Sequence, residues 1–219
     1  DILSIQLYAA ITKLPKALKE FGWTGPYIVS EWGATGHWEV PKTSWGVPIE
    51  ENSTIKAANY LKRYQIAIEP DTTQCLGSYV FLWGQKQERT PTWYGVFLED
   101  GRETESVDVM HFIWNNKWPE NRTPQIELFT LNNKTAYQNL IIEEGKELKA
   151  LISIKDFEED TINYNWEVLP ESTDLKDGGD QESRPEKVKL EMQQTPVTSF
   201  NYVEPPKTKS LLTVSSEDI

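Results

Sequence analysis

The sequence predicts an α/β region followed by an all-β region. In residues 1–120, short apolar strand-like runs alternate with helix-like segments, an order that implies a parallel sheet with right-handed crossovers. Beyond that point, the runs alternate or carry β-branched residues between polar turns, which is typical of a β-sandwich. Eight of the nine tryptophans lie in residues 1–118, so the composition changes at the same place.

Length and charge narrow the classes of function. A chain of 219 residues is long enough for two ordinary domains. Its net charge of −12, from 34 acidic and 22 basic residues, repels nucleic acid and anionic lipid, so we expect no nucleic-acid partner. No apolar run approaches the roughly 20 residues that span a bilayer. A single cysteine, Cys75, excludes an intramolecular disulfide bond.

The α/β region is expected to contain three buried strands and three helices. Strands are predicted at residues 2–8, 26–33 and 76–83, each short and apolar. Helices are predicted at residues 14–21, with Pro15 in the first turn, from Asn52 or Ser53 to Ile68, and around Val107, Met110 and Trp114. Because each crossover has the length of a helix, we expect the strands to be adjacent and parallel.

The all-β region is expected at residues 121–219. Its predicted strands are residues 125–131, 140–143, 147–155, 162–169 and 188–192. Five or six strands are counted where an immunoglobulin-like sandwich has seven, which leaves room for a missing closing strand. Residues 173–185 carry too many charges to be buried and are expected to form an exposed loop. Two prolines in residues 118–124 favour an extended, semi-rigid connector.

Glu31 is the candidate for chemistry. It follows Ile28, Val29 and Ser30 at the end of a predicted parallel strand, where functional groups collect. A carboxylate there is partly desolvated and stays ionised when hydrogen-bond donors or cations converge on it. Alternatively, Glu31 caps a neighbouring helix or pairs with a lysine at the same end of the sheet. Its position alone does not decide between this structural role and a catalytic one.

Tryptophans gather in the two loops that follow the second and third strands. A flat indole suits the apolar face of a pyranose ring, and polar neighbours can bond the sugar hydroxyls. The loop tryptophans are Trp32, Trp38, Trp45, Trp83 and Trp93, and the polar neighbours are His37, Glu39, Gln85, Lys86, Gln87, Glu88 and Arg89. This pattern indicates a sugar site. His37 is expected to be a hydrogen-bond donor or a surface residue, since two histidines cannot build a metal cluster.

Residues 26–33, with Glu31 before Trp32 and Gly33, resemble the seventh barrel strand of the clan of retaining (β/α)₈ glycosidases that includes glycoside hydrolase families two and five. Residues 77–84 resemble the eighth strand and residues 1–8 the sixth. The loops between them are similar to a bacterial group with a family two-like TIM-barrel domain. The resemblance implies that residues 1–120 are the last portion of a TIM barrel, about strands six to eight, followed by an immunoglobulin-like β-sandwich.

The same resemblance implies the roles of individual residues. Glu31 would be the catalytic nucleophile, and Trp83 would form the floor of the neighbouring sugar subsite. The full set of expected substrate-binding residues is Tyr8, Trp32, His37, Trp38, Trp83, Gln85, Lys86 and Trp93. The clan's acid/base Glu lies at the end of the fourth strand, which would precede residue 1, so the chain by itself is expected to be inactive. No cofactor or metal is expected.

Two functions remain open at this point. The first is a retaining glycoside hydrolase or transglycosylase that acts on a β-linked glycan. The second is a non-catalytic glycan-binding or scaffold subunit of a cell-surface assembly. In both cases, we expect a carbohydrate partner, an upstream part of the same barrel, and an extracellular, periplasmic or cell-surface location. A membrane-surface complex would need a lipoprotein anchor that these 219 residues do not contain.

Overall fold

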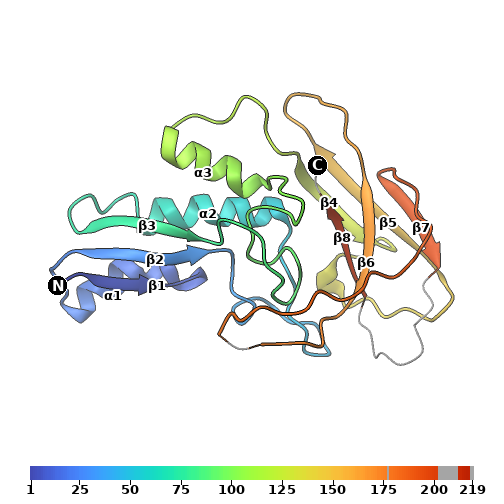
Figure 1. Cartoon of the computed structure of the whole chain (residues 1–219), viewed down its shortest axis with the longest axis horizontal. Helices are drawn as coiled ribbons and strands as arrows, with labels where there is room; N and C mark the ends of the chain where they lie inside the picture. The colour runs from blue at the N-terminus through green and yellow to red at the C-terminus, as the bar shows by residue number, and fades with distance from the viewer. Residues whose placement is uncertain (177, 202–211, 218–219) are drawn as a thin grey trace.

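The α/β region and the all-β region lie side by side, and the parallel strands of the first point toward the second (Figure 1). The computed structural model describes residues 1–176, 178–201 and 212–217, the last as backbone. Within these ranges, no helix has the length and apolar character needed to cross a membrane.

The sheet of the α/β region has the predicted order and direction. Its strands are β1 (Leu3–Gln6), β2 (Tyr27–Gly33) and β3 (Cys75–Phe81). They pair in parallel in the order β1-β2-β3, with Ile5 opposite Val29 and Trp32 opposite Val80. The prediction of three adjacent parallel strands is therefore confirmed.

The three predicted helices are confirmed as well. They are α1 (Leu14–Phe21), α2 (Ser53–Ala67) and α3 (Glu105–Asn115), and a 3₁₀ turn that was not predicted, η1 (Ala9–Lys13), precedes α1. Asn52 caps α2 because its side-chain oxygen accepts the N–H of Ile55 at 2.9 Å. Gly22 ends α1 in the left-handed conformation, with φ of 74°, which glycine adopts without steric cost.

The core of the α/β region lies between the sheet and its helices. Val29 and Trp32 of β2 are fully buried, and the Trp32 ring contacts Tyr60 and Tyr64 of α2. The buried Arg63 of α2 donates to the carbonyl of Gly33 at 2.6 Å. The helix thus fixes the end of β2, the strand that carries Glu31.

The predicted TIM-barrel portion is wrong. The parallel sheet has three strands and does not close, so β1 and β3 are both edge strands among the described residues. A barrel of this class closes with eight strands. Ser4 and Gln6 of β1 are exposed, as are Leu76 and Tyr79 of β3, at 59% and 65%. Short apolar parallel strands look alike in open and closed sheets, so the local pattern could not establish closure.

The described residues of the all-β region form one three-stranded and one two-stranded antiparallel sheet. The first has the order β4-β5-β7, and the second pairs β6 with β8. Their bounds are β4 (Gln125–Leu131), β5 (Glu147–Lys155), β6 (Asn165–Pro170), β7 (Val197–Asn201) and β8 (Leu212–Glu217). Leu148, Ala150, Trp166 and Phe200 form a core, where Phe129 stacks on Trp166 at 6.0 Å between ring centroids.

The set of strands predicted for an immunoglobulin-like sandwich is wrong. The described residues supply three and two strands, short of seven, and β7 and β8 were not predicted. Residues 140–143 are not a strand, and Ile141 there is 82% exposed. Asn139 and Gly145, both with positive φ, turn the chain on either side of it. Residues 188–192 are not a strand either, although Val188 donates to the carbonyl of Val168 at 2.8 Å.

The connector between the two regions, residues 118–124, contacts both of them. The Arg122 guanidinium lies between the rings of Trp118 and Phe157, 4.0 and 3.9 Å from their centroids. Such cation–π contacts contribute about 0.5–2 kcal/mol each. The N–H of Thr123 donates to Asp108 of α3 at 2.7 Å. The predicted semi-rigid connector is therefore held against both the α/β region and the all-β region.

Asp108 should make the stability of the protein depend on pH. Burial raises the pKa of its carboxyl above the ordinary value of 3.8, against the lowering effects of Thr123 and Arg122. A carboxyl with a raised folded-state pKa contributes stability in acid that is lost as the pH rises through that pKa. Asp108→Asn keeps an oxygen for the Thr123 N–H and cannot ionise. We expect its Tm relative to wild type to rise between about pH 4 and pH 7.

Thermal unfolding across that range measures the difference, with Asp160→Asn on an exposed loop as the control. A Tm difference that does not change with pH would show that Asp108 ionises as freely in the folded chain as in the unfolded one.

Candidate functional site

The Glu31 carboxylate is held by two side chains of the neighbouring chain segment. The Tyr8 hydroxyl, just after β1, donates to Oε1, and the Gln6 amide donates to Oε2 at 3.3 Å. Gln6 is the register partner of Glu31 in the parallel ladder, and Leu7 N–H bonds the Glu31 carbonyl at 3.0 Å. Both carboxylate oxygens therefore have donors, as an ionised, half-buried carboxylate requires.

Tyr8 is the centre of an aromatic cluster. Its ring meets Trp38, Tyr94 and Phe81 edge to face, with centroid separations of 5.4, 5.7 and 6.0 Å. Burial, the hydrogen bond to Glu31 and the negative charge of Glu31 raise the pKa of the Tyr8 phenol well above its usual range. The hydroxyl consequently stays protonated and acts as a donor to Glu31.

His37 connects two loops beside this cluster. Its Nε2 lies 3.1 Å from an Arg89 Nη, and its Nδ1 lies 2.9 Å from the Tyr94 hydroxyl. Because arginine can only donate, Nε2 must accept, and the proton of the neutral ring is on Nδ1. Burial first, and then the Arg89 charge, lower the pKa of His37 below 6.5. His37 is therefore neutral at pH 7.

Trp38 supplies an exposed aromatic face beside Glu31. The side chain is 57% exposed, and its ring touches Tyr8 at 5.4 Å and His37 at 4.9 Å between centroids. An exposed indole that contacts Tyr8, the donor to the Glu31 carboxylate, is a suitable platform for the apolar face of a sugar ring. The structure thus brings together four of the predicted site residues, Glu31, Tyr8, His37 and Trp38.

Trp32 and Trp93 are not brought to this site. Successive strand residues point to opposite faces, so Trp32 enters the helix layer and is fully buried, while Glu31 does not. Trp93 is 2% exposed, and its Nε1 donates to the carbonyl of Thr35 at 2.9 Å. Both tryptophans belong to the core and cannot touch a substrate in this arrangement.

Trp83, the predicted subsite floor, does not contact the Tyr8 cluster among the ring pairs of the described residues. Trp83 is 48% exposed and packs against Phe97 and Trp114, each at 5.2 Å. Phe81, two residues earlier, is the β3 ring that touches Tyr8. The observed strand ends at Phe81, whereas the predicted strand extended to residue 83. Because the strand is shorter than predicted, Phe81 and not Trp83 is the β3-end ring that lies against Tyr8.

Three polar residues expected to meet a sugar are bonded within the protein instead. Gln85 donates to the carbonyl of Pro91 at 2.8 Å, and Lys86 pairs with Glu88 at 2.8 Å. Glu39 accepts the N–H groups of Ala9, Ala10 and Gly36 at 2.9–3.1 Å. These groups shape the loops that surround the site.

Gln6, Phe81 and Tyr94 are site residues that the sequence reasoning missed. Gln6 could have been found, because it lies two residues before Tyr8 on the predicted strand of residues 2–8. Tyr94 follows a predicted substrate-binding residue, Trp93, but only the folded loop shows which of the two rings turns inward to Tyr8. Among the described residues, no group of three His, Cys, Asp or Glu side chains could hold a metal ion.

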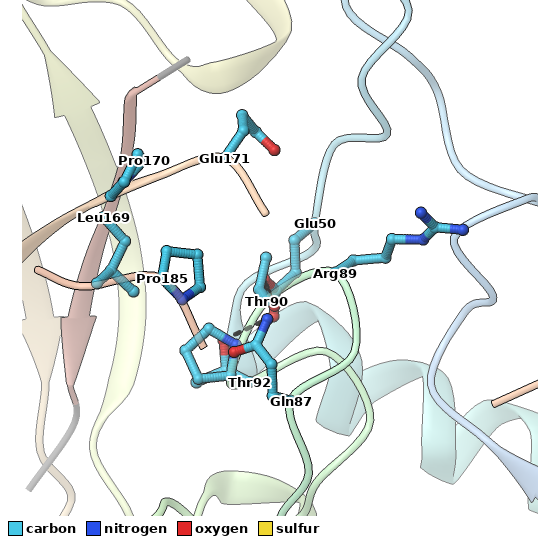
Figure 2. Close-up of a pocket in the computed structure, with 10 residues that line it drawn as sticks. Glu50, Gln87, Arg89, Thr90, Thr92, Leu169, Pro170, Glu171 and Pro185 are labelled. Carbon is cyan, nitrogen blue, oxygen red and sulfur yellow. Dashed lines mark hydrogen bonds between the residues drawn. The ribbon is translucent and has the colours of Figure 1, made fainter. Parts of the chain in front are cut away.

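A hollow lies between the loop after β3 and the all-β region, apart from Glu31 (Figure 2). Gln87, Thr90 and Pro91 line one side, and Leu169 and Pro185 line the other. Figure 2 shows the Gln87 amide directed among the lining residues, whereas the Arg89 side chain extends away from them. The backbone of Arg89 thus lies at the hollow, while its guanidinium bonds the His37 ring.

No protein-family model matches the chain, and no curated protein matches it with significant similarity. The geometry of the site and the resemblance of its strand motifs are therefore the basis on which a function is proposed.

The two classes of loop tryptophan should differ sharply in their effect on stability. We expect Trp93→Ala to lower the free energy of unfolding by about 3–5 kcal/mol, because it leaves a cavity and an unpaired Thr35 carbonyl in the core. Trp38→Ala removes an exposed ring with two edge contacts and should cost about 1 kcal/mol. Urea unfolding monitored by circular dichroism measures both. Equal losses would contradict the assignment of Trp93 to the core.

Proposed function

We propose that this chain provides the nucleophile and part of the sugar-binding surface of a retaining glycoside hydrolase or transglycosylase that acts on a β-linked glycan. The observation that supports this most is the Glu31 carboxylate, which is held by Tyr8 and Gln6, together with the exposed ring of Trp38 that contacts Tyr8. Under this proposal, the protein acts where glycans are met, outside the cytoplasm or at the cell surface.

In the proposed reaction, Glu31 attacks the anomeric carbon and forms a glycosyl ester as the bond to the leaving oxygen breaks. A second carboxyl protonates that oxygen, and then removes a proton from the water or sugar hydroxyl that cleaves the ester. Tyr8 and Gln6 fix the orientation of the attacking carboxylate. Glu31 supplies one of the two carboxyls that this reaction requires.

A non-catalytic glycan-binding subunit is the second candidate. Glu39, an acidic residue in the loops around the site, is occupied by three backbone N–H groups and is not available as a proton donor to a substrate. A site with an aromatic platform and one carboxylate can hold a sugar without cleaving it. The two candidates differ in whether Glu31 forms a covalent bond.

Covalent labelling tests the nucleophile directly. A 2-deoxy-2-fluoro-β-glycoside can carry a dinitrophenolate leaving group, which departs without protonation. The labelling reaction therefore needs no acid/base carboxyl. We expect a panel of such glycosides to include one that adds a single glycosyl unit to Glu31, detected by mass spectrometry of the intact chain and its peptides. Glu31→Gln should abolish labelling because it removes the negative charge and keeps the shape.

Glu20→Gln is the matched control, since Glu20 is an exposed carboxylate on α1 paired with Lys16. It should label like wild type. If the chain binds glycans and none of the fluoroglycosides labels Glu31, the glycan-binding candidate replaces the enzyme.

Glycan binding should depend on Trp38 and not on Trp83. Trp38→Ala removes the exposed ring beside Glu31, and we expect it to weaken binding about tenfold. Trp83→Ala removes a comparably exposed ring that packs on α3, and should leave the Kd within about twofold. Isothermal titration calorimetry with the oligosaccharide that binds best in a glycan array measures both. A larger loss of glycan affinity in Trp83→Ala than in Trp38→Ala would instead show that Trp83 forms the floor of the subsite.

A further inference from the structure

Residues 172–176 and 178–187 of the all-β region reach back across the loop that follows β3. Figure 1 shows this segment running beneath the junction of the two regions, beside the loops at the strand ends. The Glu182 N–H donates to the Gln87 carbonyl at 3.3 Å, and Lys86 donates to the carbonyl of Gly179. Two parts of the chain about ninety residues apart are thus joined next to the candidate site.

Glu182 is an exception to the expected exposure of this segment. Asp174, Lys176 and Asp180 are at least partly exposed, as predicted, whereas Glu182 is 2% exposed. Asp177 lies outside the described residues. A buried carboxylate is costly unless donors surround it. Glu182 meets this condition by accepting the N–H of Arg89 at 2.6 Å on one oxygen and that of Lys176 at 3.1 Å on the other.

The bond to Arg89 acts on a backbone that most residues avoid. Arg89 has φ of 63°, in the left-handed region, which costs a residue with a side chain about 1 kcal/mol or more. The Glu182 carboxylate offsets that cost at the same residue. With its backbone so fixed, Arg89 directs its guanidinium to His37 Nε2 at 3.1 Å.

The contacts continue from His37 to the candidate nucleophile. His37 bonds the Tyr94 hydroxyl and touches Trp38, and both of these rings meet Tyr8, the donor to Glu31. We propose that Glu182 is a positioning residue for the candidate sugar site, through which the all-β region fixes Arg89 so that its guanidinium holds the His37 ring against Trp38 and Tyr94. As a statement about a sugar site, this inference rests on the proposed function.

Titration of His37 can report whether Arg89 is in place. Burial, Arg89 and Lys42 lower the pKa of His37, whereas Glu88 and Glu182 raise it. If Glu182 acted through its charge alone, its removal would lower the pKa of His37 further. If Glu182 positions Arg89, its removal releases the guanidinium and opens the site to water, and the pKa should rise toward 6.5. The two roles therefore predict shifts of opposite sign.

The experiment is an NMR titration of the full chain, which has two histidines, so His111 on α3 serves as an internal reference. We expect Glu182→Ala to raise the His37 midpoint toward 6.5 and to leave that of His111 unchanged. Asp180→Asn, an exposed carboxylate of the same segment, is the matched control and should shift neither. A lowered or unchanged His37 midpoint in Glu182→Ala overturns the inference.

A second variant keeps the test decisive if Glu182→Ala does not fold. Arg89→Gly removes the guanidinium and suits the left-handed backbone, and it should raise the His37 midpoint as well. Glu182→Gln, which retains the size of the side chain, should move the midpoint in the same direction. In the Arg89→Gly background, a substitution of Glu182 should add little, because both act through one group. An additive shift would overturn the inference.

Glycan binding separates this inference from the proposed function. If wild type binds a glycan through Trp38, Glu182→Ala should raise its Kd severalfold, and an unchanged Kd would show that Glu182 does not position the sugar site. If wild type neither binds nor reacts with any glycan, the proposed function fails, and the His37 titration alone decides whether Glu182 positions Arg89.

Discussion

The parallel register of β1 and β2 is the constraint on which the candidate site depends. It sets Gln6 opposite Glu31 and carries the chain directly into Tyr8, so that both donors of the carboxylate come from one neighbouring segment. A half-buried carboxylate without such donors would lose its charge or leave the site. The register in turn depends on the buried faces of the two strands, because a one-residue slip would turn Val29 and Trp32 away from the helices.

The rest of the site is built outward from this pair by aromatic and polar contacts. Phe81, Tyr94 and Trp38 surround Tyr8, and His37 fixes the positions of the last two. Each of these side chains comes from a loop or a strand end, and loops need support to hold a fixed geometry. Arg63 supplies part of that support from α2, and Glu182 supplies part from the all-β region.

Local patterns in the sequence predicted what depends on near neighbours. The helices capped by Asn52 and ended by Gly22, the three parallel strands, and the place of Glu31 at a strand end all follow from short-range periodicity and capping. The face taken by Trp32 was not predictable in this way, because a register irregularity between Val29 and Trp32 breaks the simple alternation and brings both residues into the core.

What the sequence did not predict depends on partners far away in the chain. Closure of the sheet depends on what pairs with its edges, and the same apolar strand suits an open or a closed arrangement. The burial of Glu182 required a donor at Arg89, which no local rule connects to it. Strands β7 and β8 follow polar or weakly patterned segments, and their pairing with β5 and β6 determines their structure.

Among the residues that the structure describes, no strand pairs with the outer edges of β1 and β3, and this has a consequence for how the protein behaves at high concentration. An unpaired strand edge is a template for another chain, and polar side chains make it a poor one. The edge at β1 carries the exposed Ser4 and Gln6, while the edge at β3 carries the exposed Leu76 and Tyr79. Self-association should therefore begin at β3. The net charge of −12 keeps copies apart in dilute buffer, but about 1 M salt shortens the reach of that repulsion to roughly 3 Å. Salt would then change the colloidal behaviour of the protein without changing its fold.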